Sequence, residues 1–289
     1  MFGRLLKILF VPCILLIFAV WQSGIVAAPV DDPIVLPVVT STRKPTPTPR
    51  PTAMPTLPPP ATATLVPVAT STPLPSITPT PTKVIIVHPA SDGVTRSVNV
   101  PILMYHYISA PPSPTDSLRV GLSVPPEKFD AQMNLLAERG YHSLTLLEMY
   151  TFLQNGEALP TNPVVITFDD GYIDNYEFAF PILKKYGFIG TFFILSGPID
   201  NGNPNYMTWD MVKELSDSGM DIELHSRDHF DLRNRSNDFL VYQLVGGRQT
   251  IEAHTGQPIH FMAYPSGKYD AAVLRVLASA DFWGAVTTQ

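Results

Sequence analysis

Beyond residue 100, segments with the apolar pattern of a strand alternate along the chain with segments that have the apolar pattern of a helix. Short apolar runs bounded by Gly, Pro or Asp predict strands, and longer stretches with an apolar residue every three or four positions predict helices. The predicted strands are 102–105, 142–144, 164–168, 191–195, 222–224, 261–264 and 284–287, and the predicted helices are 129–139, 146–154, 176–186, 208–218, 239–255 and 271–279. This alternation predicts an α/β fold around a parallel sheet, in the pattern of an α/β barrel.

The strand predicted over 164–168 ends at two adjacent carboxylates, Asp169 and Asp170, followed by Gly171. Parallel sheets present their chemistry at the carboxyl ends of strands. Two neighbouring buried carboxylates repel each other unless a cation neutralises one of them. An Asp-Gly pair after a strand is also common in ordinary turns, so the pair alone is compatible with either interpretation.

The strand predicted over 222–224 leads into two histidines, His225 and His229. Two imidazoles and one carboxylate make three protein ligands, which leaves a position open for water, as in catalytic zinc sites. Histidines at this spacing also occur without a metal. The metal hypothesis therefore depends on the two segments meeting at one edge of the sheet.

The segments TFDDG (167–171) and HSRDH (225–229) resemble the polysaccharide deacetylase family, also called the NodB homology domain or carbohydrate esterase family 4. The stretches 129–141, 181–193, 208–229 and 263–269 are similar to that family in its usual order, so the resemblance covers about 99–289. It implies a distorted (β/α) barrel. Whether this barrel lacks its last element stays open.

The resemblance also implies roles for the clustered polar residues. Asp170, His225 and His229 would hold a divalent metal, most simply zinc, although cobalt or nickel suits the same ligands. Asp169 would be the general base that takes a proton from water.

Two further segments complete the implied site. The loop after strand 261–264 would contact substrate through Tyr264 and Pro265 and stabilise the oxyanion through the backbone N–H of Ser266. His106, directly after the first strand, is the candidate general acid, as in the branch of the family that resembles poly-N-acetylglucosamine deacetylases. A role for His106 in capping the strand or bracing Asp169 stays open.

The chain departs from the family pattern at Ala263, where family members often carry an Arg that orients the base. Whether Lys268 compensates is open. Trp283 is expected in the core, and His254 and His260 are expected to be surface or packing residues.

These observations favour a metal-dependent hydrolase that removes N-acetyl groups from an extracellular polymer containing N-acetylglucosamine, either an exopolysaccharide or peptidoglycan. One alternative is a non-catalytic carbohydrate-binding or cell-wall protein on the same barrel. Another is an O-deacetylase of xylan-like polymers, because ester and amide hydrolysis share a tetrahedral intermediate.

The first 28 residues carry positive charge before an apolar run and predict a signal peptide or an N-terminal membrane anchor. Residues 29–96 are rich in Pro and Thr and predict a disordered, extended linker of roughly 200 Å at most. Residues 97–289 form the predicted catalytic domain. We expect export, with the protein secreted or anchored to the outer face of the cytoplasmic membrane in a bacterial envelope, and membrane contact only through the first segment.

Composition adds two constraints to the 289-residue chain. The only cysteine, Cys13, lies in the first segment, so the exported part contains no thiol for a disulfide. The formal net charge of −6 argues against nucleic acid as a partner, because such binding needs clustered Lys and Arg. The expected partner is a polysaccharide, and the oligomeric state stays open.

Overall fold

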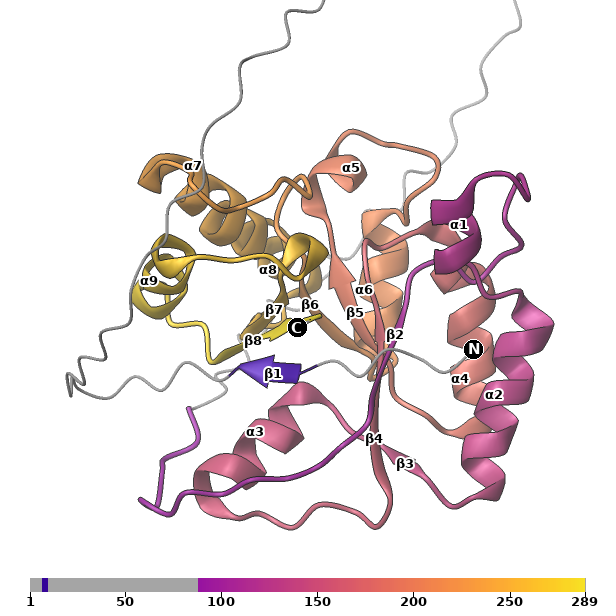
Figure 1. Ribbon diagram of the computed structural model, residues 1–289, viewed down its shortest axis with the longest axis horizontal. Coiled ribbons are helices and arrows are strands. Elements are labelled where there is room, and N and C mark those ends of the chain that lie inside the picture. The colour runs from indigo at the N-terminus through magenta and orange to yellow at the C-terminus, as the bar shows by residue number, and fades with distance from the viewer. Residues whose placement is uncertain (1–6, 10–87, 289) are drawn as a thin grey trace, which may run out of the picture. The chain divides into compact units, whose positions relative to one another are not determined.

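The computed structural model describes residues 7–9 and 88–288 of the chain. Its strands form one sheet in the order β1-β8-β7-β6-β5-β4-β2, with β3 paired to β4 off this path (Figure 1). The strands are β1 (Lys7–Leu9), β2 (Ile102–Tyr105), β3 (His142–Ser143), β4 (Pro163–Phe168), β5 (Thr191–Ile194), β6 (Asp221–Leu224), β7 (Phe261–Ala263) and β8 (Gly284–Thr287).

Every pairing from β2 to β8 is parallel, and β1 alone pairs antiparallel, with β8. From β4 to β8 the spatial order follows the chain order, because a helix returns the chain between successive strands. No pairing joins β1 to β2 within the described residues, so the sheet is an open (β/α) barrel. The predicted distorted barrel is thereby confirmed.

The helices that connect the strands begin at recognisable sequence signals. Pro126 occupies the first turn of α2, Thr145 and Glu148 form a capping box at α3, and Asp270 caps α9. The helices are α1 (Ser117–Leu122), α2 (Pro126–Glu138), α3 (Leu146–Asn155), α4 (Phe180–Tyr186), α5 (Ser196–Asp200), α6 (Trp209–Asp217), α7 (Asn237–Val241), α8 (Gly247–Thr255) and α9 (Ala271–Ser279).

All predicted strands and helices are present, with ends displaced by three residues or fewer. Two of the predicted helices contain a π-helical turn, η1 (Asn175–Ala179) before α4 and η2 (Tyr242–Gly246) between α7 and α8. The short helices α1 and α5 were not predicted. Each is too short to show a helical period, and α1 buries none of its side chains.

Alternate strand residues pack into two separate hydrophobic clusters. Val164, Ile166 and Phe168 of β4 pack with the helices α2, α4, α6, α8 and α9, whereas Val165 faces the other side, where α3 covers the sheet. Both faces of the parallel sheet are therefore buried, which explains why β4 is almost uniformly apolar. Trp283 is 3% exposed and lies in the second cluster, as predicted.

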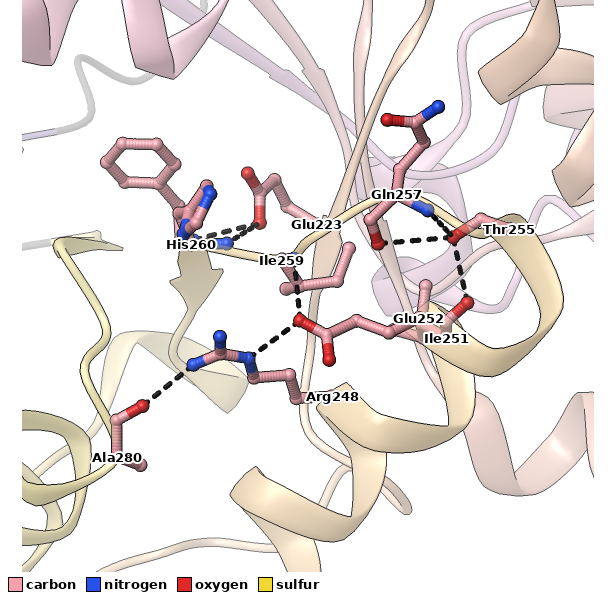
Figure 2. A network of polar contacts seen from close by, with 10 residues as sticks. Glu223, Arg248, Ile251, Glu252, Thr255, Gln257, Ile259, His260 and Ala280 are labelled. Atoms are coloured by element: carbon pink, nitrogen blue, oxygen red, sulfur yellow. Dashed lines mark hydrogen bonds and ion pairs between the residues drawn. The ribbon is translucent and has the colours of Figure 1, made fainter. Parts of the chain in front are cut away.

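A polar network fixes the start of β7 against β6 and α8. The buried carboxylate of Glu223 accepts hydrogen bonds from the backbone N–H groups of His260 and Phe261, at 3.1 and 2.9 Å (Figure 2). Glu252 accepts from the N–H of Ile259 at 3.0 Å and from Arg248 at 2.9 Å. These bonds satisfy backbone groups just before and at the start of the short β7. They place β7, and with it Ala263, beside the end of β6.

Of the segment predicted as a signal peptide or anchor, only β1 is described. The rest of that segment and the predicted linker up to residue 87 lie outside the described residues. Across 7–9 and 88–288, none of the helices has the length and apolar character needed to cross a membrane.

Candidate metal centre and active site

The predicted site residues follow different strands but gather at one edge of the sheet. His106 follows β2, Asp169 and Asp170 follow β4, His225 follows β6, and Ser266 lies in the loop after β7. Parallel strands end at the same edge, so these loops become neighbours although the residues are up to 160 positions apart in sequence.

Asp170 and His225, together with His229, form a potential metal centre. The Nε2 atoms of His225 and His229 lie 3.5 and 3.6 Å from Oδ1 of Asp170, and the three ligand atoms all lie within 4.8 Å of one another. A tetrahedral zinc site with ordinary bond lengths spaces its ligand atoms about 3.3–3.4 Å apart. The donor set and its spacing therefore fit a zinc-like divalent cation.

The backbone prepares His225 for this role. Its Nδ1 lies 2.9 Å from the carbonyl oxygen of Ala263, which can only accept, so Nδ1 carries the hydrogen. Nε2 then presents its lone pair toward Asp170 and His229. Burial, followed by the neighbouring His229, lowers the pKa of His225 to about 3, which keeps the imidazole neutral as a metal ligand requires.

The loops at the site hold an unusual backbone conformation. Asp170, Ser226, His229 and Ser266 have φ angles of 76°, 69°, 57° and 55°. The left-handed region costs a residue with a side chain about 1–2 kcal/mol and persists only where the surroundings enforce it. The fold thus maintains strain at two of the three potential ligands.

Asp169, the predicted base, is 7% exposed and lies beside the triad. Burial raises its pKa well above the ordinary carboxyl range, and the charge of Asp170 raises it further. A carboxylate with a raised pKa is a stronger proton acceptor once it is ionised. Its Oδ2 lies 3.8 Å from Nε2 of His106.

Comparison with known proteins agrees with this geometry. A model of the polysaccharide deacetylase family matches residues 156–284, which include both aspartates, both histidines and Ser266. A Bacillus subtilis (strain 168) protein named polysaccharide deacetylase YxkH is 33% identical over 194 residues, covering 67% of this chain and 66% of the relative. The chain belongs to the polysaccharide deacetylase family.

Two further deacetylases are similar. The poly-beta-1,6-N-acetyl-D-glucosamine N-deacetylase of Staphylococcus aureus (strain MRSA252) is 33% identical over 125 residues, which are 41% of this chain and 42% of that protein. The structure of the Streptococcus pyogenes deacetylase PplD in complex with acetate has a TM-score of 0.60 and 34% identity, covering 64% of this chain and 81% of that one. The chain thus spans less than two thirds of the length of the two curated relatives.

Within residues 88–288, neither Ala263 nor Lys268 places a cation beside Asp169. Ala263 packs its side chain into the second hydrophobic cluster, and Nζ of Lys268 lies 3.9 Å from Asp231. Across the described residues, the basic side chain within 4.0 Å of the Asp169 carboxylate is the imidazole of His106, and neither a Lys nor an Arg pairs with it. Lys268 therefore does not compensate for Ala263 through an ion pair with the base.

The loop after β7 presents one of its three predicted residues to solvent. Tyr264 is 2% exposed and stacks on Tyr269 at 4.6 Å between ring centroids, and Pro265 is buried too. Ser266 is exposed and lies in the short 3₁₀ turn η3 (Pro265–Gly267). The oxyanion role of its N–H and the substrate contacts of Tyr264 and Pro265 stay predictions.

His254 and His260 have packing contacts. His260 is 7% exposed and stacks on Trp283 at 3.5 Å, while the exposed His254 stacks on Trp209 at 4.2 Å. Both match the prediction of surface or packing residues.

Asp174 and Asn175 were missed by sequence reasoning. Both are buried, and both bond to the segment that follows β2. The only signal in the sequence is their polarity at the start of a helix, which is ordinary at that position.

Proposed function

We propose that this member of the polysaccharide deacetylase family is a metal-dependent hydrolase that removes N-acetyl groups from an extracellular polymer of N-acetylglucosamine. The observation that carries the proposal is the Asp170, His225 and His229 cluster, with ligand spacing suited to zinc, beside the buried carboxylate of Asp169. The similarity to a poly-β-1,6-N-acetylglucosamine deacetylase supports the choice of substrate class.

The reaction assigns one task to each side chain. Asp170, His225 and His229 would hold the cation, which when bound supplies Lewis acidity at the acetyl carbonyl and makes water easier to deprotonate. Asp169 accepts a proton from the attacking water as its oxygen bonds to the acetyl carbon. The backbone N–H of Ser266 donates a hydrogen bond to the developing oxyanion.

The leaving amine is a poor leaving group unless it is protonated, and His106 is placed to supply this proton. Burial lowers the pKa of His106 to about 4, so the imidazole is neutral before the reaction. Its Nε2 lies 3.8 Å from Oδ2 of Asp169, which is longer than a direct hydrogen bond. In this proposal the two side chains come closer in the substrate complex, and the proton taken from water then passes to the imidazole. Transfer to the amide nitrogen breaks the C–N bond and releases acetate and a free amine.

The first segment and the Pro- and Thr-rich residues fit a place outside the cell. In this proposal residues 1–28 direct export or anchor the chain in the membrane, and residues 29–96 act as a spacer toward the polymer. Zinc is the expected metal because its preferred ligands include imidazole and carboxylate.

The test is acetate release by the purified full chain from β-1,6- and β-1,4-linked N-acetylglucosamine oligomers, peptidoglycan and acetylated xylan. Release from one of the first three that stops with a chelator and with Asp169→Asn supports the N-deacetylase. Release from xylan alone would favour the O-deacetylase, and a folded, metal-loaded chain that binds polymers but releases no acetate would favour a carbohydrate-binding protein.

A further inference from the structure

The turn that carries the base and a metal ligand also holds the segment that carries His106. The side-chain N–H of Asn175 donates to the carbonyl oxygen of His106 at 2.7 Å. Asp174 accepts from the hydroxyl of Ser109 at 2.6 Å. One turn, which begins at Asp169, is therefore bonded to both ends of the 106–109 segment.

Stacked rings add to these bonds. The ring of Tyr172 stacks on that of Tyr107, with centroids 3.9 Å apart and an angle of 21° between the planes, and the guanidinium of Arg119 covers Tyr107 at 2.9 Å. Arg119 also donates to Ser109 at 3.3 Å. The segment after β2 is thus held from the β4 turn on one side and from α1 on the other.

The sheet alone does not fix His106. The register between β2 and β4 ends at the pair Tyr105 and Phe168, and the next backbone bond, from the N–H of Asp169 to the carbonyl of Tyr105, is 2.9 Å long. His106 is one residue beyond it. Among the described strands β2 lies at the edge of the sheet, so no second strand holds this position. The hydrogen bond from the Asn175 side chain to the His106 carbonyl takes the place of the next backbone bond between the strands.

The contacts of the side chain at position 175 require a hydrogen-bond donor. Asn175 is fully buried, and its single amide nitrogen donates both to the His106 carbonyl and to Oδ1 of Asp174, at 3.0 Å. Both partners only accept, so an ionised Asp could bond to neither. A carbonyl left without its donor and shielded from water is unfavourable, which would favour displacement of the His106 backbone.

We propose that Asn175, oriented by Asp174, is a positioning residue for His106 in proton transfer to the leaving amine. The inference rests on the proposed function and on His106 as its general acid. The β4 turn, besides bearing the base and a ligand, sets the distance at which the proton donor stands from them.

The test measures the rates of two variants, Asn175→Ala and the milder Ser109→Ala, on two substrates that differ in their leaving group. An amine leaves only with a proton, whereas the nitrophenolate of 4-nitrophenyl acetate leaves without one. General acid catalysis contributes about 10²–10⁴-fold, so Asn175→Ala should lower kcat for an N-acetylglucosamine oligomer about tenfold or more. Its rate on 4-nitrophenyl acetate and its zinc affinity should stay close to those of the unmodified chain, and Ser109→Ala should show the same selectivity with a smaller loss.

Two controls separate the positioning of His106 from a general loss of protein stability. Thr255→Val removes a buried hydrogen bond of α8, far in sequence from the site, and should lower stability without any selectivity between the substrates. In a His106→Ala background, Asn175→Ala should cause no further loss on the oligomer, because it acts through the missing imidazole.

Equal losses on both substrates, or a full further loss in the His106→Ala background, would overturn the inference and leave the proposed function standing. If Asn175→Ala fails to fold, Ser109→Ala decides by the same criteria. An unmodified chain that releases no acetate from any N-acetylglucosamine polymer would instead overturn the proposed function, and the inference with it.

Discussion

Asp170→Asn should have opposite effects on the metal-loaded and metal-free protein. With zinc, the variant loses the only carboxylate ligand of the triad and with it most of the stabilisation by metal. Without zinc, it removes the charge that raises the pKa of the buried Asp169 and so relieves repulsion between the two side chains. Asn also tolerates the left-handed backbone at this position, where φ is 76°.

The size of the zinc-dependent melting shift follows from the stabilisation that a ligand gives by binding only the native state. A ligand at a hundred times its dissociation constant stabilises the native state by about 2.7 kcal/mol. For a domain of this size the melting temperature moves roughly 2–4 °C per kcal/mol. The unmodified chain should therefore gain about 5–11 °C with zinc, and Asp170→Asn should gain little while melting at or above the unmodified chain in chelator.

Differential scanning calorimetry of the full chain with zinc and with chelator measures both effects. His254→Asn is the matched control, because His254 is exposed and stacks on Trp209 away from the triad, and it should keep the full zinc shift. A full zinc shift in Asp170→Asn would refute the assignment of this ligand. A metal-free variant that melts well below the unmodified chain would refute the argument from repulsion.

Three further changes test other parts of the molecule. Asp169→Asn should lower acetate release about a hundredfold or more but leave the zinc-dependent melting shift intact; loss of that shift would make Asp169 a ligand instead. Burial raises the pKa of Asp221 from its ordinary 3.8 to about 6, so its contribution to stability is fully present below the unfolded value and is lost as the pH rises through about 6. Asp221→Asn should remove this decline in urea midpoints measured between pH 4 and pH 7, and an unchanged decline would assign it to other groups. Trp283→Ala should destabilise the fold by about 3–5 kcal/mol in urea titration, since the ring is buried against His260 and Tyr150; a cost below about 1 kcal/mol would contradict its place in the core.

The sequence determined the elements and the identity of the reactive groups. Strand and helix periods are local properties, and buried runs such as 164–168 show them clearly, so every predicted element is present. The two aspartates directly follow a strand, and the two histidines lie four residues apart, so their grouping could be proposed before any distance was known. The short helix α1 shows no such period and was missed.

Only the tertiary structure decided which groups meet and in which state. His106 comes to 3.8 Å from Asp169 because β2 pairs with β4, although β3 lies between them in the chain. The tautomer of His225 depends on the carbonyl of Ala263, which β7 delivers from 38 positions away. The ion pair between Lys268 and Asp231 and the hydrogen bond from Asn175 to His106 depend on the same long-range packing. The local pattern specifies each strand, but strand order and loop packing come from burial across the whole sheet, and these set the distances on which catalysis depends.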